Sequence, residues 1–184
     1  AVYAAGARDF GENYVQEAVD KIEALDALMP ENQAIWHFIG PLQSNKTRLV
    51  AEYFDWVHSV DRLKIAQRLS EQRPVSRAPL NICLQVNISQ QDSKSGCTID
   101  EATALALSIA QLPNLRLRGL MVIPAPMNPT DSWAQQRAPF DALHILFERI
   151  KTQLPPEQAS FFDTLSMGMS DDYELAIAAG STIV

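Results

Sequence analysis

The chain has 184 residues, 47% of them hydrophobic, with a formal net charge of −7 and a sequence pI of about 4.9. This is enough for one domain with a sizeable core, and the dispersed acidic balance argues against nucleic acid or an anionic membrane as a partner. Cys83 and Cys97 lack C-x-x-C spacing, so we expect reduced thiols. No apolar run approaches the roughly 18 residues that a membrane-spanning helix needs, and we therefore expect a cytoplasmic protein.

Short apolar, β-rich runs alternate along the chain with segments in which apolar residues recur at three- and four-residue spacing. This alternation is typical of βα units arranged around a parallel sheet. The runs cover residues 8–11, 35–40, 56–60, 81–87, 115–123 and 161–165, and a further run begins at Ser181. Between the runs we expect amphipathic helices that pack on the strands.

Three helix boundaries can be placed from local signals. Thr98 and Glu101 form the sequence pattern of a capping box, which predicts a helix that starts at 98–101, continues through the run 102–112 and ends before Pro113. The segment 125–139 is rich in proline, and we expect a broken loop there before a helix over 140–154. Ser170 followed by two aspartates predicts another helix start, because acidic residues in a first turn complement the helix dipole.

The number of apolar runs fits either a doubly wound open sheet or a (β/α)8 barrel. No G-x-G-x-x-G pattern follows any run, and polar residues recur at the C-terminal ends of nearly all of them, which favours the barrel. A complete barrel takes about 250 residues, and this chain opens with Ala1 and stops at Val184 inside a β-rich run. We therefore expect a single α/β domain over 1–184, a TIM barrel that lacks its first strand and the end of its last.

The polar residues at the strand ends favour anion binding. In the segment 165–172 a strand ends at small and hydroxyl residues, including Ser166, Gly168 and Ser170, where backbone N–H groups and hydroxyls can cradle a phosphate. Alternatively, Ser170 only caps its helix and Gly168 only relaxes the turn. From these residues alone both interpretations stand.

Other chemistry has less support. The three histidines, His37, His58 and His144, are scattered and form no H-x-x-x-H pair, so no metal site is expected. No G-x-S-x-G motif indicates a hydrolase, and the adjacent carboxylates of Asp171 and Asp172 would not face each other on a helix. We assign no catalytic residue.

Several longer motifs follow one another from about Gly6 to the end of the chain. They are FGENYVQE at 10–17, WHFIGPLQSNK at 36–46, QVN at 85–87, SKSG at 93–96, RGLM at 118–121 and SMGMSDD at 166–172. Together they resemble the pyridoxal phosphate homeostasis protein family, whose fold is similar to the N-terminal barrel of alanine racemase.

The resemblance implies that the chain binds pyridoxal 5'-phosphate (PLP), the vitamin B6 cofactor, and buffers or delivers it to PLP-dependent client enzymes without an established reaction. Carried over to this sequence, the cofactor-binding residues are Asn13, His37, Gly40, Met121, Ser166, Gly168, Met169 and Ser170. The family's internal aldimine lysine would lie upstream of Ala1, and an Arg-Ile-Gly-Thr segment would follow Val184. That arginine, at the pyridine nitrogen, would weaken the electron sink that racemases use.

Two further hypotheses accompany this interpretation. Lys94, in a loop after the run ending at Asn87, is a candidate amine for secondary, reversible capture of PLP, although an ordinary exposed lysine is the favoured explanation. The alternative function is a PLP-dependent amino-acid racemase or isomerase. Racemisation by two bases needs a second proton donor on the other face of the substrate, and none of the tyrosines in this chain has an obvious place for that role.

Overall fold

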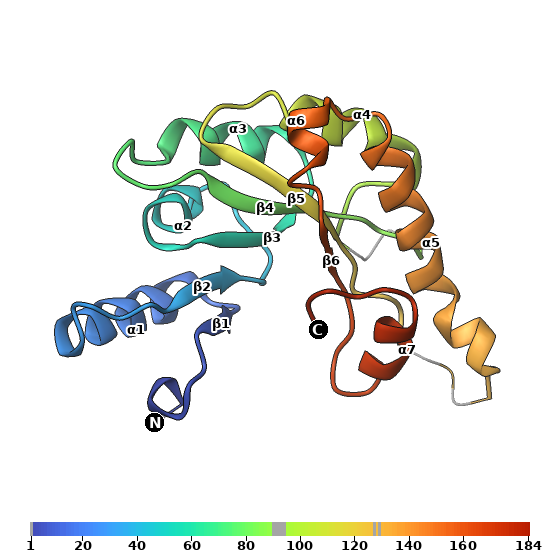
Figure 1. The fold of residues 1–184 in the computed structure, drawn as a ribbon, viewed down its shortest axis with the longest axis horizontal. Coiled ribbons are helices and arrows are strands. Elements are labelled where there is room, and N and C mark those ends of the chain that lie inside the picture. Colours follow the sequence, from blue (N-terminus) through green and yellow to red (C-terminus); the bar gives the residue numbers. More distant parts are fainter. Residues whose placement is uncertain (1, 90–94, 127, 129) are drawn as a thin grey trace.

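The computed structural model describes residues 2–89, 95–126, 128 and 130–184. Its strands form one parallel sheet, ordered β1-β2-β3-β4-β5-β6. They are β1 (Asp9–Glu12), β2 (Ile35–Phe38), β3 (Trp56–Val60), β4 (Leu80–Gln85), β5 (Leu115–Met121) and β6 (Thr164–Ser166). Neighbours in sequence are neighbours in space, and the sheet curves instead of lying flat (Figure 1). The barrel prediction is therefore confirmed, because a doubly wound sheet would reverse its strand order.

The run predicted to begin at Ser181 returns to the sheet beside β6. Ile183 forms a parallel bridge with Ser166, and its carbonyl oxygen accepts a hydrogen bond of 3.0 Å from the N–H of Met167. This segment and β1 lie at the two ends of the curve, so the described strands form an incomplete barrel.

Close approach of the last two strands depends on a glycine. A Cβ atom at Gly119 in β5 would lie 1.7 Å from the carbonyl oxygen of Thr164 in β6. No side chain fits at that distance, so glycine at this position permits the parallel pairing of β5 with β6.

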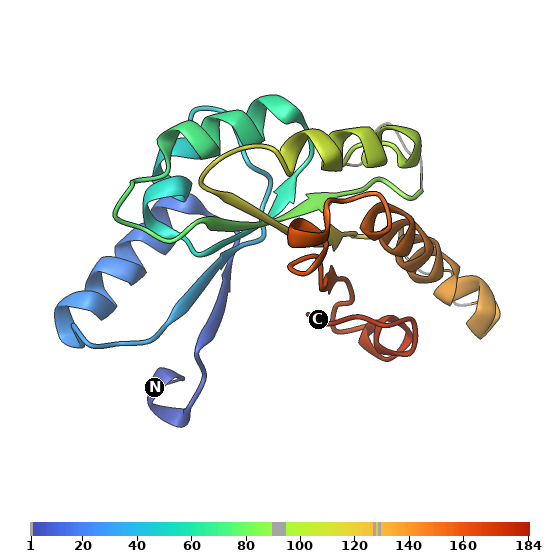
Figure 2. The ribbon, with the colours of Figure 1, turned by 45° about the horizontal axis from the view of Figure 1, so that its top comes forward.

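Helices cover the outer face of the curved sheet (Figure 2). They are α1 (Val15–Leu28), α2 (Thr47–Tyr53), α3 (Leu63–Gln72), α4 (Ile99–Ile109), α5 (Trp133–Lys151), α6 (Pro156–Ala159) and α7 (Tyr173–Ala178), with a short 3-10 helix η1 (Tyr3–Ala5) before β1. The predicted periodicity is realised: α1 buries Val15, Val19 and Ile22, and α3 buries Ile65 and Leu69. Within the described chain, no helix combines the length and apolarity that crossing a bilayer requires.

The capping box predicted for α4 is present. Thr98 accepts a hydrogen bond from the N–H of Glu101 through its hydroxyl, and the Glu101 carboxylate accepts one from the N–H of Thr98. The helix runs from Ile99 to Ile109, so its start at the capping box is confirmed and its end lies three residues earlier than predicted.

The start predicted for α5 is wrong. The helix begins at Trp133 and contains Pro139, because Ser132 and Gln135 form a second capping box. A proline removes one backbone donor and crowds the preceding turn, but here the capped first turn and the long apolar stripe that follows keep the helix continuous.

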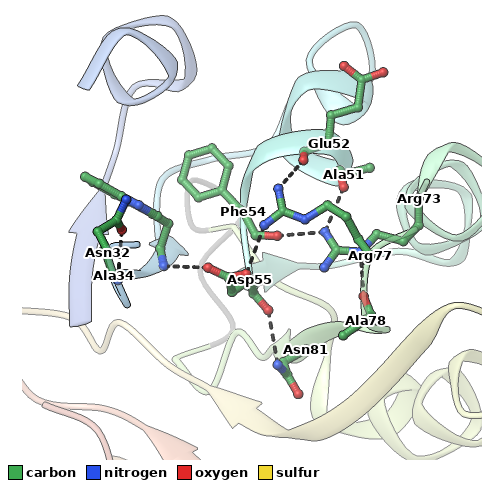
Figure 3. Close-up of polar contacts among 11 residues, drawn as sticks. Asn32, Ala34, Ala51, Glu52, Phe54, Asp55, Arg73, Arg77, Ala78 and Asn81 are labelled. Carbon is green, nitrogen blue, oxygen red and sulfur yellow. Dashed lines mark hydrogen bonds and ion pairs between the residues drawn. The ribbon is translucent and has the colours of Figure 1, made fainter. Parts of the chain in front are cut away.

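A polar cluster joins the N-terminal ends of β2, β3 and β4 (Figure 3). Its centre is Arg73, only 5% exposed, which follows α3. Its guanidinium donates to the carbonyl oxygens of Ala51 and Phe54 at 2.7 Å each and to that of Ala78 at 2.8 Å. Burial, followed by the proximity of Arg77, lowers the pKa of Arg73 to about 10. Charged hydrogen bonds therefore tie the end of α3 to the loops that enter the strands.

Asp55, just before β3, completes this cluster. Its carboxylate accepts from the N–H of Trp36 at 2.9 Å and from the guanidinium of Arg77 at 3.1 Å. Its carbonyl oxygen accepts from the side chain of Asn81 at 3.2 Å. The cluster thus fixes the entrances of three neighbouring strands and, with them, the relative positions of the strands' other ends.

Candidate functional site

A cavity of about 360 Å³ lies at the C-terminal ends of the strands, within the curve of the sheet. Parallel barrels carry their functional residues at this end. Of the eight residues predicted to bind a cofactor, six line the cavity: Asn13, His37, Met121, Ser166, Gly168 and Met169. They come from β1, β2, β5 and β6 and the segments that follow them, so residues distant in sequence meet at one place.

The other two predicted residues, Gly40 and Ser170, do not line this cavity. A Cβ atom at Gly40 would lie 2.3 Å from the carbonyl oxygen of Asn13, so the glycine lets the segment after β2 pass close to Asn13. Ser170 is exposed in a turn between β6 and α7. The first supports the cavity wall from behind, and the second does not contribute to it.

The helix start predicted at Ser170 is also wrong. The chain makes a turn over 170–172, and α7 begins at Tyr173. The turn is stabilised by Asp172, whose carboxylate accepts a hydrogen bond of 2.5 Å from the N–H of Met169. Because α7 is a single short helix of six residues, hydrogen-bond donors before it matter more to the cavity than its dipole does.

Ser166 and Gly168 supply donors at this point. Gly168 has a φ of 104°, which favours glycine, and among the described residues its N–H has no hydrogen-bond acceptor. The N–H of Met169 is already taken by Asp172. The backbone N–H of Gly168 and the hydroxyl of Ser166 are therefore the donors this segment can present to an anion in the cavity.

Two histidines that are 21 residues apart meet in the wall of the cavity. The parallel register places His37 of β2 beside Trp56 of β3, which brings His58 within reach. The Nδ1 atom of His37 lies 2.9 Å from Nε2 of His58, and Nδ1 of His58 lies 2.7 Å from the hydroxyl of Ser166. Nε2 of His37 lies 3.1 Å from the carboxylate of Asp9 in β1. Asp9, His37, His58 and Ser166 thus form a hydrogen-bonded chain across the interior, which we call the histidine relay.

Burial keeps both imidazoles of the relay neutral. It lowers the pKa of His58 to about 3, with the neighbouring His37 as a second cause. Burial also lowers the pKa of His37, while the hydrogen bond and charge of Asp9 oppose that shift. At neutral pH each ring therefore has one N–H donor and one bare nitrogen acceptor.

An aromatic and ionic layer lies below the relay. The ring of Trp56 stacks on His37 with centroids 5.3 Å apart, and the guanidinium of Arg118 lies 4.6 Å from the centre of the Trp56 ring. Arg118 is itself paired with Asp163 at 2.8 Å. This layer packs against His37 outside the cavity lining and places the Arg118 charge against an indole ring.

Sequence reasoning missed His58 and Asp9 as parts of the site. Nothing local distinguishes His58 from an ordinary core histidine, and the contact arises only from the pairing of β1, β2 and β3. The one available signal was the position of His58 in the predicted run 56–60, because every second residue of a barrel strand faces the interior. Lys94 lies outside the described residues.

The fold and the cavity together define a barrel of the alanine racemase type. Consistent with this, residues 1–184 match the family described as alanine racemase, N-terminal domain.

Individual relatives narrow the assignment. The chain is 59% identical over 182 residues to the pyridoxal phosphate homeostasis protein of Pseudomonas aeruginosa, covering 99% of this chain and 73% of the relative. Two structures of PipY from Synechococcus elongatus are also similar. The one without PLP gives a TM-score of 0.85 at 40% identity and the one with PLP bound gives 0.82 at 39%, each covering 98% of this chain and 80% of PipY. The chain belongs to the pyridoxal phosphate homeostasis protein family.

Proposed function

We propose that the protein binds PLP in the strand-end cavity and buffers or delivers it to other proteins. The observation that carries this proposal is the placement on one wall of the cavity of the Ser166 hydroxyl and of Gly168, whose N–H has no acceptor among the described residues. The names of the relatives, and the PLP-bound structure of PipY, support the identity of the ligand.

The cavity fits such a ligand in size and in chemistry. Its volume of about 360 Å³ lies within the usual range for small-molecule sites. Ile39, Met121 and Ile123 supply apolar surface for a flat ring, and Ser166 and Gly168 supply donors for a phosphate. When bound, PLP supplies an aldehyde that condenses reversibly with amines, and the protein's own residues hold, orient and shield it.

The proposal includes carriage of PLP without catalysis of its own. All four tyrosines lie off the cavity lining. Tyr3 belongs to η1, and Tyr53 donates a hydrogen bond to Glu23 on the outside. Tyr14 and Tyr173 precede and begin helices and are 69% and 44% exposed. In this arrangement no tyrosine of the chain serves as the second proton donor of a racemase.

The place of action that we propose is the cytoplasm, where PLP-dependent client enzymes would receive the cofactor. Cys83 and Cys97 are both free thiols and buried, which suits a reducing compartment. Secondary capture of PLP by Lys94 stays a prediction.

Replacement of Ser166 tests the proposed site. PLP affinity of the full-length protein is measured by fluorescence titration for the wild type, Ser166→Ala and the control Ser108→Ala, whose hydroxyl donates to a carbonyl on the exposed face of α4. Loss of a hydrogen bond to a charged group, worth about 1.5–3 kcal/mol, should weaken binding by roughly 10- to 100-fold. The control should bind as the wild type does. Equal affinity of Ser166→Ala and the wild type would contradict the assignment.

A further inference from the structure

The histidine relay has a fixed direction of hydrogen bonding. A carboxylate only accepts hydrogen bonds, so His37 must donate from Nε2 to Asp9. A neutral His37 then has a bare Nδ1, which accepts from the Nε2–H of His58. The Nδ1 of His58 is bare in turn, and it accepts from the hydroxyl of Ser166. The hydrogen of Ser166 therefore points into the protein wall.

A fully ionised phosphate or sulfate group cannot accept a hydrogen bond from this hydroxyl while its hydrogen is donated to His58. Such an anion only accepts hydrogen bonds, so Ser166 must turn its hydrogen toward the ligand. Its oxygen then has to accept from Nδ1–H of His58, which leaves Nε2 of His58 to accept from Nδ1–H of His37. Because Nε2–H of His37 still faces the carboxylate of Asp9, His37 now has a hydrogen on both nitrogens.

We propose that the relay couples anion binding at Ser166 to the uptake of one proton, which resides on His37 against the carboxylate of Asp9. The proton balance is closed: a proton from solvent enters His37, each relay hydrogen shifts by one bond, and the hydroxyl hydrogen of Ser166 turns to the anion. Asp9 is a route for entry because its side chain is 67% exposed. His37 and His58 are thereby positioning residues that match the hydroxyl of Ser166 to a bound phosphate, an inference that rests on the proposed function.

The groups around His37 suit this coupling. Asp9 faces it from β1 and His58 from β3, while Asp55, before β3, adds a weaker attraction for a proton. The Trp56 ring contacts both His37 and the Arg118 guanidinium. In the free protein, burial keeps the pKa of His37 below its ordinary value. An anion at the other end of the relay raises that pKa, so anion affinity should increase as pH falls through the range between the free and bound pKa values of His37.

Inorganic sulfate is the decisive probe, because it stays fully ionised over pH 6–9 and brings no proton of its own. Sulfate is titrated in a calorimeter into full-length protein from which any PLP has been removed, and a separate competition titration against 4'-deoxypyridoxine 5'-phosphate, which lacks the aldehyde, tests whether both anions share the site. Two buffers of different ionisation enthalpy report the protons taken up per sulfate bound. At a pH between the two His37 pKa values we expect the protein to take up close to one proton per sulfate bound. In the same range the sulfate affinity should fall by up to about tenfold for each unit that the pH rises.

Variants localise the proton. His37→Asn keeps a hydrogen-bonding group beside His58, but its amide can present either oxygen or NH2, so binding should proceed with proton uptake near zero. The control His144→Asn alters a histidine that contacts the carbonyl oxygen of Ala179 outside the cavity, and it should behave as the wild type. Ser166→Ala should weaken sulfate binding and abolish the uptake.

The outcomes separate the two proposals. If 4'-deoxypyridoxine 5'-phosphate binds and sulfate competes with it, but sulfate binds the unliganded protein with no proton uptake and no pH dependence, the relay coupling is wrong and the PLP site stands. If wild type and His37→Asn take up the same number of protons, the coupling is also wrong. If 4'-deoxypyridoxine 5'-phosphate does not bind at all, both proposals fall together.

Discussion

Arg73 at the N-terminal ends of the strands places its N–H donors on three backbone carbonyl groups, whereas at the C-terminal ends the N–H of Gly168 has no acceptor among the described residues. The first region satisfies its polar atoms with protein partners. The second keeps His37 and His58 neutral and leaves donors in the wall of a cavity. Stability and binding therefore belong to opposite ends of the barrel. The N-terminal ends of the strands hold the strands in place, and the C-terminal ends carry the residues that face the cavity.

The largest effect should come from breaking the cluster at the N-terminal ends. Arg73→Ala removes the donors from the carbonyl oxygens of Ala51 and Phe54, which are buried, and from that of Ala78, which is partly buried, so the free energy of unfolding should fall by about 3 kcal/mol. Arg48→Ala is the matched control, because Arg48 is 68% exposed and lies 4.0 Å from Glu52; its effect should stay below about 0.5 kcal/mol. Urea denaturation measures both. If both variants lose the same stability, the cluster does not have the role assigned to it.

At the cavity end, the burial of His58 should make the free energy of unfolding depend on pH. The unfolded chain protonates His58 near its ordinary pKa of 6.5, but the folded protein resists this down to a pKa of about 3. The unfolded state thus binds more protons between these values, so stability is full above pH 6.5 and is lost as pH falls. Between pH 6.5 and 5 the wild type should lose about 1.5 kcal/mol more than His58→Gln.

Denaturation curves at pH 7, 6 and 5 supply the comparison for this prediction. His144→Asn serves as the control, since the His144 side chain is 43% exposed, and it should follow the wild type. Parallel curves for the wild type and His58→Gln would show that His58 is not buried in its neutral form.

The smallest effect concerns catalysis. Full-length protein loaded with PLP and incubated with L-alanine and a panel of other L-amino acids should form almost no D-enantiomer, because no tyrosine of this chain lines the cavity. Chiral chromatography measures the product. Turnover of roughly 1 per second or more, lost when the family's cofactor-linked lysine is replaced, would favour the racemase instead.

Sequence reasoning reached the fold through particular residues. The apolar runs became β1 to β6 with ends within a few residues, and the capping box at Thr98 and Glu101 formed as predicted. The start of α5 was misplaced because Pro139 is a strong local signal for a break, while the capping pattern of Ser132 and Gln135 was overlooked. Such errors arise where two local signals compete within one segment.

The site was harder to predict because part of it exists only in three dimensions. Ser166, Gly168 and Asn13 belong to motifs that could be recognised, and they do line the cavity. His58 could not be recognised, since its hydrogen bonds to His37 and Ser166 span 21 and 108 residues. Those contacts depend on strand register and curvature, which local patterns do not specify.

A crystal structure of the full-length protein with PLP tests the central claim most directly. We predict a phosphate oxygen within hydrogen-bond distance of both the hydroxyl of Ser166 and the N–H of Gly168, with the ring beside Met121. A phosphate bound elsewhere, with neither Ser166 nor Gly168 in contact with it, would contradict the account.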